Sequence, residues 1–318
     1  MVPSELLPAA DSRETVSHAA VARQIVWILR LAIAIQAVGI ASQYLYSQYE
    51  IESPLFNYLL YDREWPQDTA QYLDDLLVEG WLVVGLTLFI APLATALMQR
   101  LGLLRVSEEN RLWKIGGLLQ RLLLGLILLV QLILVWAAWY RGTGERFNDL
   151  LPVEQSARWM IPVLLGLLLP RGGEVVSAKR FHTAMWLLRL TVAVTFFAHG
   201  LKAIYGQKDF IDYLLVAGSS LIGWEASEVA VTRLLTIIGW LDVAAAILVL
   251  ARQWRSVAIY MALWGIITAY SRVVHSGMSS HFEVAIRSGN YCLPLAVLFY
   301  FRYTRSIQKL ARRENAEK

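Results

Sequence analysis

The sequence predicts an all-α integral membrane protein of eight transmembrane helices, arranged as two tandem four-helix repeats in the same orientation, with both termini cytoplasmic. Three observations predict this fold class. The 318 residues are 57% hydrophobic and only 17% charged, with a mean hydropathy of +0.48, which is too apolar for a soluble domain of this size. The chain contains eight apolar stretches. The segments between them alternate between acidic and basic.

The apolar stretches are the predicted spans. A helix needs about 20 mostly apolar residues to cross a hydrocarbon layer of about 30 Å. Eight stretches reach or approach this length, and they cover residues 24–46, 79–98, 115–139, 159–170, 182–204, 233–250, 256–274 and 289–303. The first is longer than a signal-peptide core of about 7–15 residues, so we expect it to be retained. The fourth is short and contains Pro162, which a spanning helix tolerates when neighbouring groups satisfy the freed carbonyl.

The connecting segments predict the orientation, because basic loops stay on the cytoplasmic side. Segment 47–79 holds a single base, Arg63, and eight carboxylates: Glu50, Glu52, Asp62, Glu64, Asp68, Asp74, Asp75 and Glu79. We expect it to face outward. The next segment contains Arg100, Arg105, Arg111, Lys114 and Arg121 against Glu108 and Glu109, so we expect it inside. The alternation continues to a basic tail, which predicts a multi-pass protein of the inner (plasma) membrane.

Composition also limits the possible functions. Nearly the whole chain is used by spans and short connections, so we expect neither a soluble catalytic domain nor a nucleic-acid partner. Cys292 is the single cysteine, and one thiol cannot form an internal disulfide or a dithiol redox pair. No HxxxH or HExxH spacing is present, so we expect no metal site.

The chain divides into five predicted parts. These are a cytoplasmic N-terminal segment (1–23), a first and degenerate repeat (24–170), a cytoplasmic linker (171–181), a second repeat (182–303) and a basic cytoplasmic tail (304–318). Matching features recur in the same order: Leu29-Arg30 and Leu188-Arg189, Gly80-Trp81 and Gly239-Trp240, Pro162 and Pro294. Because each repeat has an even number of spans, the two copies would share one orientation. Chance similarity between leucine-rich helices remains the alternative.

The second repeat, about residues 182–303, carries a series of features in a fixed order: Gly200 and Lys202, then Phe210, then Gly239 and Asp242, and then a basic turn at Arg252 or Arg255. With these features it resembles the DoxX-like family of four-helix membrane proteins. The resemblance implies a membrane partner in redox systems, since some relatives look like the quinone-linked membrane subunit of thiosulfate:quinone oxidoreductase. The first repeat departs from the pattern, because Ser42 stands in place of the lysine and Val83 in place of Asp242.

Polar residues cluster on the predicted outer side of the second repeat. The candidates for proton transfer are Asp242 and His199, because an imidazole titrates near neutral pH and a shielded carboxyl can be tuned toward it. The candidate ligand-binding residues are Lys202, Arg272, His275 and Asn290. An intramembrane carboxylate is costly, so the alternative for Asp242 is a packing contact with Lys202 or Arg272. A metal site at His199, His275 and His281 is a further alternative.

We therefore expect a quinone- or lipid-interacting component of a membrane redox system, with an outward-facing polar pocket. The cofactor stays open, with quinone as a candidate. The expected partners are the lipid bilayer and a redox partner subunit. Whether the chain itself catalyses a reaction stays open at this stage. A small-molecule or lipid transporter built on the parallel repeat, and a membrane scaffold without catalytic function, are the alternatives.

Overall fold

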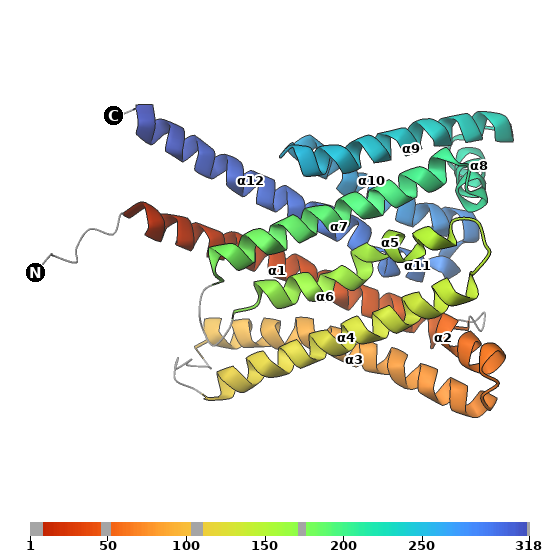
Figure 1. Cartoon of the computed structure of the whole chain (residues 1–318), viewed down its shortest axis with the longest axis horizontal. Helices are drawn as coiled ribbons and strands as arrows, with labels where there is room; N and C mark the ends of the chain where they lie inside the picture. Colours follow the sequence, from red (N-terminus) through yellow and green to blue (C-terminus); the bar gives the residue numbers. More distant parts are fainter. Residues whose placement is uncertain (1–8, 46–51, 103–110, 171–175, 317–318) are drawn as a thin grey trace, which may run out of the picture.

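The structure, a computed structural model, describes residues 9–45, 52–102, 111–170 and 176–316 (Figure 1). Within these ranges the chain is 87% helical and contains no strand, which confirms the predicted all-α class. Several of the predicted loop charges lie outside the described residues: Glu50, Arg105, Glu108, Glu109 and Arg171. The same holds for parts of the N-terminal segment, the linker and the tail, at residues 1–8, 171–175 and 317–318.

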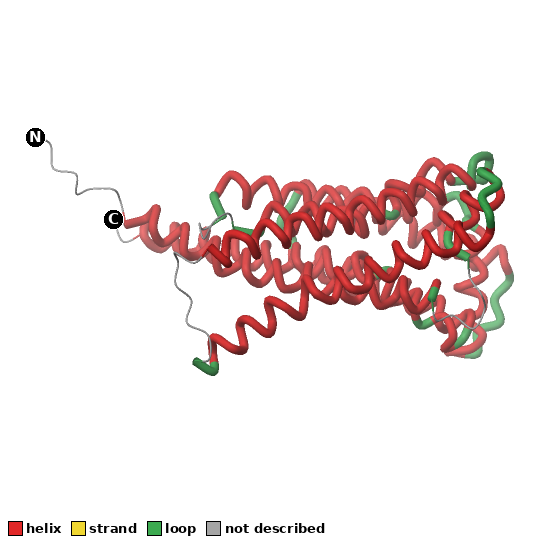
Figure 2. Tube along the Cα trace, turned by 90° about the horizontal axis from the view of Figure 1, so that it is seen from below, coloured by secondary structure: helices red, strands yellow, loops and turns green. Residues whose placement is uncertain are grey.

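Six helices of the described chain are long and apolar enough to cross a bilayer. They are α1 (Ala9–Tyr44), α3 (Gln67–Arg100), α4 (Arg111–Arg141), α7 (Ala178–Ile204), α9 (Glu228–Ala251) and α10 (Arg255–Ser276). Met278–Ile286 and Ser288–Ile307 pass the same test as a pair, with a bend of 44° between them. α6 (Ser156–Leu168) has 13 residues and coincides with the short fourth stretch. Figure 2 shows the resulting elongated bundle, which has the helix pattern of a multi-pass membrane protein.

α3 begins earlier than hydropathy predicts. The apolar run starts near residue 79, whereas the helix starts at Gln67, directly after Pro66. Good helix formers such as Gln, Ala and Leu fill the intervening turns, so the helix continues beyond its apolar part. On this extension Asp74 is buried and accepts a 2.5 Å hydrogen bond from the Ser53 hydroxyl. A large part of the predicted acidic loop is therefore helical.

Short helical pieces gather toward one end of the bundle, opposite the start of α1 and the end of α12 (Figure 1). They are α2 (Pro54–Asn57), a π-helical turn (Tyr58–Asp62), a 3-10 turn (Asn148–Leu150), α5 (Leu151–Glu154), α8 (Lys208–Ile222), a second 3-10 turn (Met278–Ser280) and α11 (Phe282–Ile286). From α11 the chain returns through the long helix α12 (Ser288–Ala316). The start of α1 and the end of α12 thus lie on the same side (Figure 1).

The core lies between α1, α6, α7 and α12. α1 packs against α3, α11 and α12, while α7 packs against α6 and α9; α4 packs on α6, and α10 on α12. The most apolar window is 67% buried in α1 and 56% in α7, against 22% in α3 and 33% in α10. The outer helices α3, α4, α9 and α10 present exposed apolar residues such as Leu122, Ile237 and Leu263. Such a surface suits contact with lipid chains.

Glycine lets several pairs of helices approach closely. Where α7 crosses α9, a Cβ atom added to Gly239 would lie 2.6 Å from the carbonyl oxygen of Gly200. A Cβ on Gly200 would in turn lie 2.8 Å from the carbonyl oxygen of Gly239. The first turns of α6 and α12 also meet, since a Cβ on Gly289 would lie 2.2 Å from the carbonyl oxygen of Ala157. A side chain at these positions would have to displace backbone atoms.

Candidate functional site

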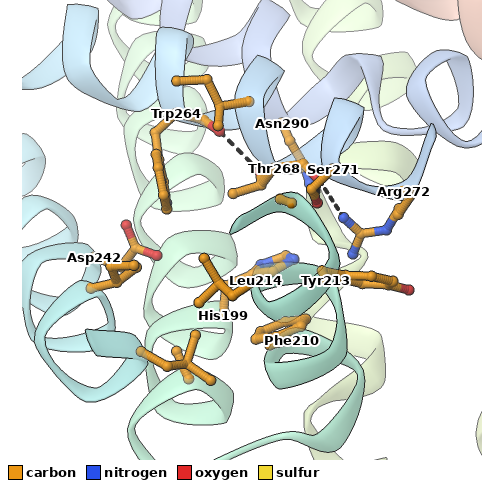
Figure 3. A pocket seen from close by; sticks show the side chains of 15 residues that line it. His199, Phe210, Tyr213, Leu214, Asp242, Trp264, Thr268, Ser271, Arg272 and Asn290 are labelled. Atoms are coloured by element: carbon orange, nitrogen blue, oxygen red, sulfur yellow. Dashed lines mark hydrogen bonds between the residues drawn. The ribbon is translucent and has the colours of Figure 1, made fainter. Parts of the chain in front are cut away.

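A cavity of about 140 Å³ lies within the second half of the chain, near the end where the short helices gather (Figure 3). α7, α8, α9, α10 and the first turn of α12 form its walls. Aromatic rings from Phe210, Tyr213 and Trp264 line it together with aliphatic side chains. Four of the six predicted site residues also line it: His199, Asp242, Arg272 and Asn290.

Asp242 reaches the cavity because of the close crossing of α7 and α9. It lies on α9 one turn beyond Gly239, beside Gly200 of α7, and it is only 4% exposed. The Tyr260 hydroxyl donates a 2.9 Å hydrogen bond to Asp242 Oδ1. Sequence reasoning named Lys202 or Arg272 as its partner, but those two side chains pair with other carboxylates. A tyrosine at the same depth on the neighbouring helix takes that role.

His199 is held in a defined orientation on α7. Its Nδ1 lies 2.8 Å from the carbonyl oxygen of Thr195, so Nδ1 carries the hydrogen and donates it. The ring is parallel to that of Phe210, with centroids 6.2 Å apart. Nε2 lies 3.4 Å from Glu154 Oε1. The imidazole is therefore fixed between the cavity wall and a carboxylate.

Glu154 connects the first half of the chain to this site. It belongs to α5 and forms an ion pair with Lys202 in addition to its contact with His199. Burial alone would raise the pKa of Glu154, but the nearby His199, Lys202 and Arg287 outweigh this effect and lower the pKa to about 2. Glu154 is therefore ionised at neutral pH. Lys202 is bound to this carboxylate and does not line the cavity.

Sequence reasoning missed Glu154, which lies in the segment between the third and fourth predicted spans. Its position beside α7 depends on packing between the two halves, for which the sequence carries no local signal. The carboxylate at 154 and the imidazole at 199 come from different predicted repeats. The first half therefore supports the cavity through Glu154, although every residue that lines the cavity belongs to the second half.

Arg272 is buried at the opposite side of the cavity from Asp242 (Figure 3). Its Nη1 donates a 2.5 Å hydrogen bond to the carbonyl oxygen of Thr268, and its guanidinium carbon lies 4.9 Å from the centroid of the Tyr213 ring. Its Nε lies 4.0 Å from Glu283, which also forms an ion pair with Arg287. That Nε has no hydrogen-bond partner. Arg272 Nε is thus a hydrogen-bond donor without a partner, and the carboxylate of Glu283 partly balances the positive charge of the guanidinium.

The remaining histidines lie away from the cavity. His275 contacts the Tyr213 ring edge-on and pairs with the hydroxyl of Ser276, and His281 pairs with the carbonyl of Met278. Among the residues that the structure describes, no group of three His, Cys, Asp or Glu side chains is placed to hold a metal ion. The alternative of a three-histidine site is therefore not supported by their positions.

No family model matches this chain, and comparisons with curated proteins and with solved structures give no match either. Any functional conclusion therefore rests on the geometry of the cavity. That geometry combines aromatic walls, a buried carboxyl group, an oriented imidazole and a buried guanidinium with a free donor.

Proposed function

We propose that the chain binds a membrane quinone in this cavity and acts as the quinone-binding component of a membrane redox system. The observation that carries the proposal is the combination of size and polarity. An apolar cavity of about 150 Å³ accommodates one benzene ring, so a volume of about 140 Å³ suits a single ring. It is too small to enclose a phospholipid.

The polar groups suit the two oxygen atoms of a para-quinone, which lie at opposite positions of its ring. Asp242 lies on one side of the cavity, and Arg272 and Asn290 lie on the other, with His199 between them (Figure 3). The donor groups of Arg272 and Asn290 can bind a carbonyl oxygen. The Asp242 carboxylate can accept a hydrogen bond from a quinol hydroxyl. Phe210, Tyr213 and Trp264 provide faces and edges for contact with the ring.

The chemistry requires a source or acceptor of electrons outside this site. Reduction of a quinone to its quinol takes up two electrons and two protons, and oxidation of the quinol releases them. We assign the electrons to a redox centre of a partner subunit. We assign one of the two protons to the Asp242 carboxyl group and the other to solvent. His199 holds its place in the cavity wall, because its Nδ1 is bonded to the Thr195 carbonyl and its Nε2 faces Glu154.

The proposal includes the finer architecture. We place the chain with the DoxX-like proteins and count the short helix α6 and the bent pair α11–α12 as one span each, which gives eight crossings and two parallel repeats. Equivalent pairs support this: α1 packs on α3 as α7 packs on α9, and α4 on α6 as α10 on α12. Ser156 and Pro162 of α6 correspond to Ser288 and Pro294 of α12, and the neighbouring residues Ala157 and Gly289 touch each other, as residues on a two-fold axis do. Basic inner segments favour cytoplasmic termini in the inner membrane.

Mass spectrometry of small molecules that copurify with the protein tests this function. The wild type, Asp242→Asn and Asp74→Asn should be extracted from the same host membrane in mild detergent. Asp74 is the matched control, because it is a second buried aspartate, 3% exposed, in the first half. We expect quinone in the wild type and in Asp74→Asn, and at least tenfold less in Asp242→Asn. Phospholipid alone in all three proteins would contradict the proposal and would favour transport or scaffolding.

A further inference from the structure

We infer that the ligand carries a long hydrocarbon tail, and that this tail leaves the cavity sideways into the bilayer through an opening between α9 and α10. This inference rests on the proposed function and names the ligand more narrowly. It concerns a part of the cavity that the polar residues do not form, namely the wall at Ile238 and Ile267.

The cavity reaches the lipid-facing surface at Ile267. This side chain lines the cavity, yet it is 55% exposed. Ile267 therefore belongs both to the cavity wall and to the outer surface of the molecule. Ile238 lines the same wall from α9 and is half-buried. Exposed apolar neighbours on both helices, Leu241 and Leu263 among them, indicate that this outside is lipid and not water.

The other walls are covered. α8 lies over the cavity and contributes Phe210, Tyr213, Leu214 and Ala217. Behind it α7 packs along α9 through the glycine contact, which leaves no room for a chain between those two helices. α10 packs mainly against α12 and α8, and only slightly against α9. The α9–α10 boundary is therefore the side where a tail can pass.

The depth of the opening suits a lipid-soluble molecule. At 1.5 Å per residue, roughly 15 Å of helix separates Ile238 from Glu228 at the start of α9, and a similar length separates Ile267 from the end of α10. This places the opening near the middle of a hydrocarbon layer of about 30 Å. Because a cavity of about 140 Å³ holds only the ring, a long tail has to remain in the acyl-chain region.

Equilibrium binding of two probes to the full chain in phosphatidylcholine nanodiscs tests this inference. The probes are tetramethyl-1,4-benzoquinone, which has no tail, and a benzoquinone with a long isoprenoid tail. The test variants Ile238→Trp and Ile267→Trp narrow the opening. The matched controls Ile237→Trp and Ile266→Trp add the same bulk at exposed neighbours that do not line the cavity, with 59% and 46% exposure.

We expect the test variants to weaken binding of the tailed quinone at least tenfold more than they weaken binding of the tail-less quinone, since both residues line the cavity and their replacement can affect the ring as well. The controls should bind both probes as the wild type does. Ile267→Ala widens the opening and should keep or tighten binding of the tailed probe. Unchanged binding of the tailed quinone by both test variants would overturn the inference, and so would equal losses for both probes. If the wild type bound neither probe, the proposed function itself would fail.

Discussion

The two halves of the chain place different structures at the same end of the bundle. In the first half, α2 and the following π-helical turn pack against the bundle and bury Leu55, Phe56, Tyr58 and Leu59. In the second half, α8 buries only Ile211 and Gly218, whereas Phe210, Tyr213, Leu214 and Ala217 line a cavity. The two short pieces of the first half therefore lie closely on the bundle, whereas α8 of the second half covers a cavity large enough for a ligand.

The helix crossings explain part of this difference. α7 and α9 meet at Gly200 and Gly239, whereas α1 and α3 meet at Ala37 and Gly85, where an added Cβ would lie 2.5 Å from that of Ala37. Gly80, which aligns with Gly239 in sequence, has nothing within 4 Å of its added Cβ. Val83, which aligns with Asp242, is accordingly 64% exposed, while Asp242 is 4% exposed. Aligned residues thus lie on different faces of corresponding helices.

The largest effect should come from exchanging the aligned glycines for leucine. Gly239→Leu forces a side chain against the backbone of α7, so we expect loss of folded protein in mild detergent, a cost above about 3 kcal/mol. Gly80→Leu should fold normally, because its surroundings are open and leucine favours helix. Thermal unfolding followed by size-exclusion chromatography measures both. Equal tolerance of the two substitutions would contradict the different crossings.

The link between the halves predicts a pH dependence. Glu154 has a folded-state pKa of about 2, below the ordinary value of 4.5, so its stabilising contribution is present above pH 4.5 and is lost as the pH falls toward 2. This shift corresponds to roughly 3 kcal/mol at most. Glu154→Gln should lower the melting temperature at pH 7 and flatten its decline between pH 5 and about 3. The exposed Glu145→Gln serves as the control, and an identical acid profile for the wild type and Glu154→Gln would argue against the network.

The hydrogen bond to Asp242 gives a smaller expected effect. Tyr260→Phe leaves the buried carboxyl group with fewer partners, which should cost about 1–2 kcal/mol of stability and weaken quinone binding severalfold. Tyr270→Phe on the same helix changes an exposed tyrosine and should be neutral. Melting temperature and quinone titration provide the two readouts. If Tyr260→Phe matched the wild type in both, Asp242 would have to be held by other groups.

The smallest effect concerns the start of each outer helical piece. Ser53 caps α2 by accepting hydrogen bonds from the amides of Leu55 and Phe56, and it also donates to Asp74. Ser53→Ala should therefore cost about 1 kcal/mol. α8 starts after Gln207, which makes no side-chain cap, so Gln207→Ala should be neutral. Amide hydrogen exchange of α2 in Ser53→Ala and of α8 in Gln207→Ala measures both effects. Equal loss of protection in the two helices would contradict the difference between their caps.

The sequence predicted part of the fold and part of the candidate site. Hydropathy predicted the helical class and the long apolar helices, and the polar residues His199, Asp242, Arg272 and Asn290 drew attention to the second half. The rotation of each helix was not predictable, because helices such as α4 and α9 are apolar around most of their circumference. The roles of Tyr260 and Glu154 depend on that rotation and on packing between halves. Charge counts also could not reveal that α3 extends to Gln67.

Photolabelling with an azido-quinone, followed by peptide mass spectrometry, tests the central contrast between the halves most directly. The label should appear on residues 208–222 and 255–276, which contribute α8 and α10 to the cavity, and excess unlabelled quinone should suppress it. Residues 54–62 of the first half should carry little label, because their side chains are packed together. Equal, non-competable labelling of both halves would contradict a quinone site confined to the second half.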